Sequence, residues 1–273
     1  MLASLIIVFR EVLEAGLVIG IVLAATRGLA GSRAWIAAGI AGGFAGACVV
    51  AGFTSFIAEA FEGTGQEIFN ACVLGAAVVM LTWHNVWMAS HGREMAEEMR
   101  EAGEAAVSGA RPLFALAIVV GAAVLREGSE VVLFLYGVTL AANLSALSLF
   151  LGGIGGLVLG ALASAGTYLG LLRIPTRYLF TVTSVMIAFL AAGMAAQAIF
   201  FLEQAGIVSA LSSIVWNSTE ILSQTSPLGI LLHTLVGYSD QPTWMELAVY
   251  LMTLAAMFIL MRMFASPARP ASA

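Results

Sequence analysis

Charge is what this sequence has least of, since only 10% of its 273 residues are Asp, Glu, Lys or Arg. Lysine is absent, so all 11 basic side chains are arginines. A soluble domain of this length needs a far more charged surface, whereas 61% of this chain is hydrophobic and its mean hydropathy is +1.01. The composition therefore excludes an ordinary soluble domain and predicts a protein whose surface faces mostly lipid.

The chain also has only two cysteines, and its basic residues are outnumbered by acidic ones. Cys48 and Cys72 lie in apolar stretches, where we interpret them as small packing residues rather than as disulfide or metal ligands. A net charge of -5 leaves no basic surface for phosphate groups, which excludes nucleic acid as a partner. Arg10, Glu11 and Glu14 interrupt the apolar N-terminus, and this pattern disfavours a cleavable signal peptide.

Long apolar stretches are abundant. A membrane-crossing helix needs about 20 mainly apolar residues. Seven stretches qualify: Leu2–Ala25, Ala34–Phe56, Glu67–Ala89, Leu113–Leu140, Leu144–Leu172, Tyr178–Phe201 and Glu246–Phe264. Residues 207–236 are also apolar but contain Asn217, Glu220, Gln224 and Pro227, so we expect an interfacial or re-entrant segment, with an eighth crossing as the less favoured alternative. The predicted fold is an all-α polytopic membrane protein with seven transmembrane helices.

Arginines occupy alternate connections between these stretches. They are Arg27 and Arg33, then Arg93, Arg100 and Arg111, then Arg173 and Arg177, and finally Arg262 and Arg269 beside the C-terminus. Because basic residues stay in the cytoplasm, the N-terminus is expected outside and the C-terminus inside. The opposite connections carry only acidic charges, which would concentrate cations, and Glu62, Glu67 and Glu203 are candidates for an outer relay. Simple solvation of the loops is an equally good interpretation of each one.

The chain resembles itself at an offset near 115 residues. Residues 9–14 parallel 125–130, and Gly39, Gly42, Gly46 and Gly52 match Gly153, Gly156, Gly160 and Gly166. Because three is an odd number of spans, the second unit starts on the opposite side of the membrane and is inverted relative to the first. Inverted repeats of this kind place a transport site near the midplane. One membrane domain is thus expected over 1–273, with a first three-helix repeat (1–90), a cytoplasmic loop (91–112), a second three-helix repeat (113–203), an extracytoplasmic loop (204–245), a seventh helix (246–264) and a cytoplasmic tail (265–273).

Each repeat contains an Arg-Glu-x-x-Glu motif inside its first span. Glutamates three residues apart share one helix face, and the arginine four residues before the second glutamate can pair with it. Arg10 lies about 13 Å along its helix, near the bilayer centre, where each ionisable group costs at least about 2.5–3.5 kcal/mol. The two motifs should therefore face each other inside the bundle, although buried ion pairs that merely hold helices together are an alternative. The candidate metal ligands are Glu11, Glu14, Glu127 and Glu130, supported by Arg10 and Arg126.

Four carboxylates and two guanidinium groups leave a net charge of about −2, and carboxylate oxygens suit hard cations. A trivalent ion would gain most, although a divalent one such as Fe2+ or Mn2+, with or without coupled protons, is equally allowed. His84 and His91 share one helix face and suggest an exit path, with an aromatic belt as the alternative. An intramembrane enzyme is disfavoured, because a di-iron carboxylate site needs Glu-x-x-His pairs and neither motif has them.

These motifs resemble those of the oxidase-dependent iron transporter family, which includes fungal high-affinity iron permeases and bacterial EfeU-type permeases. Further similarities lie at Trp83–Trp87, at Ala196-Gln197 with Phe201-Leu202, and from Trp216 through Gly237-Tyr238 to Pro242. The resemblance implies seven spans and the import of ferric iron, with the motif glutamates as ligands and no permanently bound cofactor. It also implies a separate oxidase or periplasmic iron-binding protein as partner, and the short chain suits a bacterial inner membrane.

Overall fold

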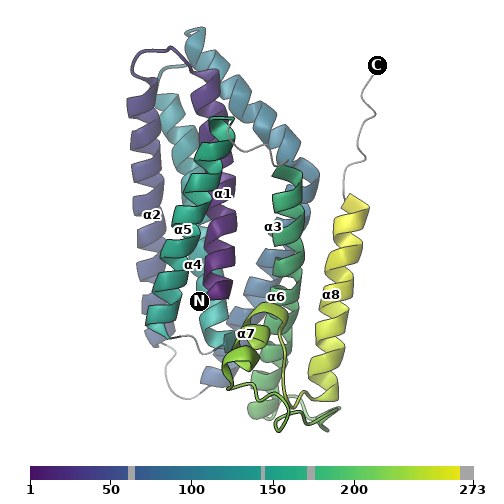
Figure 1. The fold of residues 1–273 in the computed structure, drawn as a ribbon. Coiled ribbons are helices and arrows are strands. Elements are labelled where there is room, and N and C mark those ends of the chain that lie inside the picture. The colour runs from purple at the N-terminus through teal and green to yellow at the C-terminus, as the bar shows by residue number, and fades with distance from the viewer. Residues whose placement is uncertain (61–64, 143–144, 171–175, 265–273) are drawn as a thin grey trace, which may run out of the picture.

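A computed structural model describes residues 1–60, 65–142, 145–170 and 176–264, and the elements named within them are all α-helices. Those described residues form eight helices (Figure 1): α1 (Leu2–Ala25), α2 (Ser32–Ala60), α3 (Gln66–Val107), α4 (Phe114–Ala142), α5 (Ala146–Tyr168), α6 (Thr176–Gln204), α7 (Pro227–Val236) and α8 (Trp244–Phe264). The predicted all-helical class is confirmed.

The long helices run alternately up and down a single bundle. In Figure 1, α1, α3, α5 and α8 run toward the upper end, whereas α2, α4 and α6 run toward the lower end. α2 packs on α4 and α5 packs on α1, while α3, α6 and α8 form the other side of the bundle. α1, α3 and α4 contact one another, so these three helices join the two sides.

Among the described residues, five helices are long and apolar enough to cross a membrane. Their spans are Ser32–Thr54, Gln66–Met88, Ala146–Tyr168, Thr181–Gln204 and Trp244–Phe264. α1 and α4 have 24 and 29 residues, which is also enough, but each contains the three charged side chains of its motif. The protein is thus a multi-pass membrane protein by length and composition, and seven crossings remain a prediction.

The connection between α6 and α8 contains the short helix α7. Ser226 caps it by accepting a hydrogen bond from the Gly229 N–H, and Gly237 ends it in the left-handed conformation at φ 73°. Ten residues rise only about 15 Å, which is too short to span a bilayer. α7 lies in the lower half of the bundle (Figure 1) and packs on α6, α1 and α4, with Gly237 at its end against Gly193 of α6, so it supplies no eighth crossing.

Residues 91–107, predicted as part of a cytoplasmic loop, instead continue α3 to Val107. The extension is amphipathic. On its exposed face Arg100 pairs with Glu97 and, at 2.8 Å, with Glu104, and the hydrogen bond from Arg100 lowers the pKa of the Glu97 carboxyl. On its other face Ala106 is buried against α1, α2 and α4. The i,i+4 spacing of Arg100 and Glu104 predicts a solvated helix within this cytoplasmic connection, and the structure shows that helix as a continuation of α3.

Glycines bring two pairs of helices into backbone contact. A Cβ on Gly39 of α2 would lie 2.7 Å from the Ala117 carbonyl oxygen of α4, and one on Gly156 of α5 would lie 2.5 Å from the Leu5 carbonyl oxygen of α1. Gly42, Gly52 and Gly153, which belong to the predicted repeat, face nothing within 4 Å. Close packing therefore explains only some of the repeated glycines.

Candidate metal site

The first charged motif lies on α1 and is completely enclosed. Arg10, Glu11 and Glu14 are all buried, and the side chain of Arg10 is only 1% exposed. The Arg10 Nε donates a hydrogen bond of 2.8 Å to Glu14 Oε1, while its Nη1 lies 3.8 Å from Glu11 Oε1. The expected i,i+4 pair is therefore present, and it uses Glu14 far more than Glu11.

The second motif lies on α4 and has the same internal pairing in a more open position. Arg126 Nε donates to Glu130 Oε1 at 3.3 Å, and Glu127 and Glu130 are both buried. The Arg126 side chain is 39% exposed and its guanidinium carbon lies 4.5 Å from the centre of the Trp87 ring. A cation over an indole face is stabilised by the ring, which helps to hold Arg126 beside α3.

His84 of α3 lies between the two motifs. Its Nε2 is 3.1 Å from Glu14 Oε2, and its Nδ1 is 2.5 Å from Glu130 Oε2. The neighbouring Asn85 donates from Nδ2 to the Ser184 carbonyl oxygen of α6 at 3.2 Å, and this bond helps to orient α3. Three helices thus bring charged groups from both halves of the chain to one place.

Four side chains form a compact donor set that we name the carboxylate–histidine cluster: Glu11, His84, Glu127 and Glu130. One ligand atom from each lies within 4.8 Å of the other three, and all four residues are buried. Such a set of carboxylate oxygens and an imidazole nitrogen, converging on one point, is typical of transition-metal sites.

Several oxygens of the cluster lack a hydrogen-bond donor. Neither carboxylate oxygen of Glu11, nor Oε2 of Glu127, accepts a hydrogen bond within the described residues, and the basic nitrogens nearest to Glu11 lie 3.8 Å away. A buried carboxylate oxygen without a hydrogen-bond donor is costly, because its lost hydration is not replaced. A cation held between these oxygens would replace that hydration, so the residues present fit a metal ion.

The structure separates the other sequence-predicted candidates from this cluster. Glu14 lies at its edge, occupied by Arg10 and His84. His91 is exposed and stacks on Trp87 with ring centres 5.3 Å apart, away from His84. The two histidines predicted to form one path therefore have different surroundings.

Two of the predicted outer-relay residues, Glu67 and Glu203, lie toward the lower end. Glu67 is exposed in the first turn of α3, where an acid is favourable to the helix dipole. Glu203 accepts a hydrogen bond from Thr243 at 3.0 Å, close to Glu246. Glu62 lies outside the described residues.

His84 was assigned to an exit path, and its contact with both motifs could not be read from spacing. A signal was nevertheless present, because His84 and Asn85 are adjacent polar residues in the middle of an apolar span. Polar groups at membrane depth are expensive, so such a pair indicates a function or a partner.

Known proteins resemble this chain over nearly its whole length. A profile of the iron permease FTR1 family matches residues 1–268. The ferrous iron permease EfeU of Escherichia coli O6:K15:H31 (strain 536 / UPEC) is 32% identical over 256 residues, covering 92% of this chain and 91% of that relative. The ferrous iron permease EfeU of Yersinia pestis is 32% identical over 268 residues, covering 95% and 93%. No solved structure matches the chain.

Proposed function

Because this chain belongs to the iron permease FTR1 family, whose members are transporters rather than enzymes, we propose that it moves iron across a membrane through the carboxylate–histidine cluster. The iron ion is the substrate, bound transiently and released on the other side. The observation that carries the proposal is the convergence of four buried ligand atoms, from α1, α3 and α4, within 4.8 Å.

Each charged group near the cluster has a distinct role in this proposal. Glu14 accepts a hydrogen bond from His84 Nε2, which leaves the lone pair of Nδ1 facing Glu130 and the ion. Glu14 is thus a positioning residue, although its sequence motif suggested a ligand. Arg10 and Arg126 pair with Glu14 and Glu130 and so offset part of the repulsion between the carboxylates.

The ferrous ion is the favoured species. The imidazole of His84 makes the ligand set less hard than carboxylates alone, and a net charge of about −2 from the motifs balances a divalent ion. The two relatives described above are also called ferrous iron permeases. Ferric iron is the second candidate, and it is supported by the three carboxylates among the four proposed ligands.

We assign the lower end to the outside of a bacterial inner membrane and the upper end to the cytoplasm. Arg27 and Arg33 follow α1, Arg111 follows α3, and Arg262 lies in the last turn of α8, so all four flank upper ends of helices. This distribution supports seven crossings with the N-terminus outside. Reciprocal packing of α2 on α4 and of α5 on α1 supports the inverted repeat. A separate oxidase or periplasmic iron-binding protein would meet the lower end.

Uptake of radioactive iron into proteoliposomes tests the function. We expect uptake of Fe2+ under a reductant, competition by Mn2+ and little competition by Ga3+. Strong competition by Ga3+ together with uptake of chelated Fe3+ would favour the ferric candidate. Absence of uptake of either ion by folded protein would contradict the proposal. A Glu11→Gln variant should be inactive, whereas the exposed Glu101→Gln variant is the matched control.

A further inference from the structure

A second polar site lies at the lower end of the bundle, apart from the carboxylate–histidine cluster. It is a cavity of about 620 Å³ between the lower ends of α3, α4 and α6. Its polar lining consists of Gln66, Asn70, Thr139, Gln197 and Gln204, and its apolar lining of Leu140, Phe200 and Phe201. We name it the amide cavity. An ion with six waters occupies about 200 Å³, taking about 30 Å³ for each water, so a hydrated ion fits.

The amides that line this cavity are not used by the fold. Among the described residues, no hydrogen bond involves the side-chain amide of Gln66, Asn70, Gln197 or Gln204. Thr139 donates its hydroxyl to the Leu135 carbonyl oxygen and so presents lone pairs as acceptors. The cavity therefore offers neutral oxygen acceptors, and its lining among residues 1–60, 65–142, 145–170 and 176–264 includes no charged side chain. Neutral oxygens can hold the water shell of a cation without trapping the ion.

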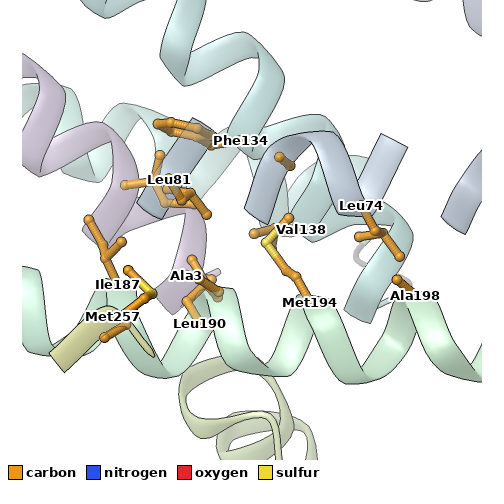
Figure 2. Close-up of a cluster of buried hydrophobic side chains, with 14 residues drawn as sticks. Ala3, Leu74, Leu81, Phe134, Val138, Ile187, Leu190, Met194, Ala198 and Met257 are labelled. Atoms are coloured by element: carbon orange, nitrogen blue, oxygen red, sulfur yellow. The ribbon is translucent and has the colours of Figure 1, made fainter. Parts of the chain in front are cut away.

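An apolar layer separates the amide cavity from the carboxylate–histidine cluster. Its buried side chains come from three helices and are Leu74, Ala77 and Leu81 of α3, Phe134 and Val138 of α4, and Ile187, Ala191 and Met194 of α6. Figure 2 shows them packed together along α6, with Leu81 and Phe134 toward one end of the layer and Leu74 toward the other. Each of these eight side chains is at most 3% exposed.

The order of the three regions is the same along each helix. On α3 the chain passes from Asn70 through the apolar layer to His84, about 21 Å of helix rise. On α4 about 13 Å of rise separates Thr139 from Glu130, with Phe134 and Val138 between them. An iron ion in the amide cavity could reach the cluster only by crossing this layer, and a bare or hydrated cation has no ligands there.

We propose that the amide cavity is an entry site that holds a hydrated iron ion by neutral oxygens, and that the apolar layer is a gate, closed in this structure, between it and the carboxylate–histidine cluster. This proposal rests on the transport function proposed above and adds a second binding site to it. Opening the gate requires α3 and α4 to separate from α6. In the closed layer the Met194 side chain of α6 fills the room that a side chain on Gly137 of α4 would need.

Cysteine labelling tests the gate. Both native cysteines are first replaced, by Cys48→Ser and Cys72→Ser, and a single cysteine is then introduced by Asn70→Cys or Ala77→Cys. Iron-depleted cells that express either variant are treated from outside with a membrane-impermeant thiol reagent. We expect Asn70→Cys to react at least tenfold faster than Ala77→Cys, because only the first lies in the cavity. Equal rates, or no outside labelling of Asn70→Cys, would overturn the proposal. Leu81→Cys, deeper in the layer, provides a second protected position.

Transport kinetics test the entry site. Asn70→Leu and Gln197→Leu should each raise the KM for Fe2+ about fivefold, the equivalent of one hydrogen-bonding group, and leave kcat unchanged. Gln241→Leu, an exposed amide at the same end but outside the cavity, should leave both constants unchanged. Bound Fe2+ in detergent should stay at the unmodified level in the two cavity variants, which shows that they fold.

The two proposals fail separately. If the unmodified protein transports iron and both cavity variants have the same KM as the unmodified protein, the entry site is overturned and the transport function stands. A protein that takes up no iron, yet shows the expected labelling pattern, would overturn the transport function and retain the closed layer.

Discussion

At the scale of single residues, the two arginines of matching motifs occupy different surroundings. Arg10 is fully buried and pairs with Glu14 at 2.8 Å, whereas Arg126 is partly exposed and pairs with Glu130 at 3.3 Å. Loss of one partner from a buried pair leaves an uncompensated charge, which costs about 3–5 kcal/mol, and the cost is smaller where the pair is longer and less enclosed.

Arg10→Met should therefore destabilise the protein much more than Arg126→Met. The expected result is a large fall in the melting temperature of the detergent-solubilised Arg10→Met protein and a small fall for Arg126→Met. Methionine keeps a long unbranched chain at both positions, so the comparison isolates the charge. Equal melting temperatures for the two variants would mean that burial does not distinguish the arginines.

His84 and His91 provide a second matched comparison. Glutamine at position 84 can still donate to Glu14 but offers no imidazole nitrogen, so His84→Gln should weaken iron binding by at least about tenfold. His91→Gln should leave it unchanged, because His91 stacks on Trp87 outside the cluster. Isothermal titration with Fe2+ under anaerobic conditions measures both. An unaltered affinity in His84→Gln would remove the histidine from the site.

Spacing along the chain predicted the pairing within each motif, because i,i+4 neighbours are determined by helix geometry alone. It could not predict that His84 of α3 touches both motifs. That contact depends on the rotation and depth of α3, which follow from its packing with α6 through Asn85 and Ser184. Contacts between helices carry no signature in local sequence.

At the scale of helices, the glycine contacts predict where side chains can be added. A Cβ on Gly156 would meet the Leu5 carbonyl oxygen at 2.5 Å and the Phe9 nitrogen at 2.8 Å, whereas Gly153 faces nothing within 4 Å. Gly156→Val should thus separate α5 from α1 and cost about 1–3 kcal/mol or more by overpacking, and Gly153→Val should be tolerated.

Fluorescence-detected size-exclusion chromatography after heating measures this difference. Both substitutions put the same β-branched residue in the same helix, so helix propensity cancels. Gly156→Val protein as heat-resistant as Gly153→Val would show that α1 and α5 are not in backbone contact at this position.

Length and hydropathy predicted the apolar helices well, since a bilayer demands about 20 apolar residues whatever the fold. The prediction placed α1 at Leu2–Ala25, as in the structure. The i,i+4 pairs of the charged connection predicted a helix there, but not that it continues α3 to Val107. Residues 207–236 were expected to form an interfacial or re-entrant segment, but the bounds of the ten-residue helix α7 within it were not predicted. Both details lie where packing against neighbours, rather than membrane thickness, determines the conformation.

At the scale of the whole molecule, the proposed path runs from the amide cavity through the apolar layer to the carboxylate–histidine cluster. Negative charge increases along this path. The cavity has neutral amides, whereas the cluster has three carboxylates, with Glu14 and the two motif arginines beside them. Such a gradient would hold a hydrated ion weakly at the entrance and a dehydrated ion tightly at the centre. The closed layer between them fits a transporter in which the two sites are not continuously connected.

The central claim is that both motifs contribute to a single site, and counting bound ions tests it most directly. Equilibrium dialysis of purified protein, at a free Fe2+ concentration that fills the cluster but not the weaker amide cavity, should give one ion per chain. Glu11→Gln and Glu127→Gln should each lose that ion, and the double variant should be no worse than either single one, while Glu101→Gln keeps it. Two bound ions per chain, with each motif variant losing only its own, would contradict the claim.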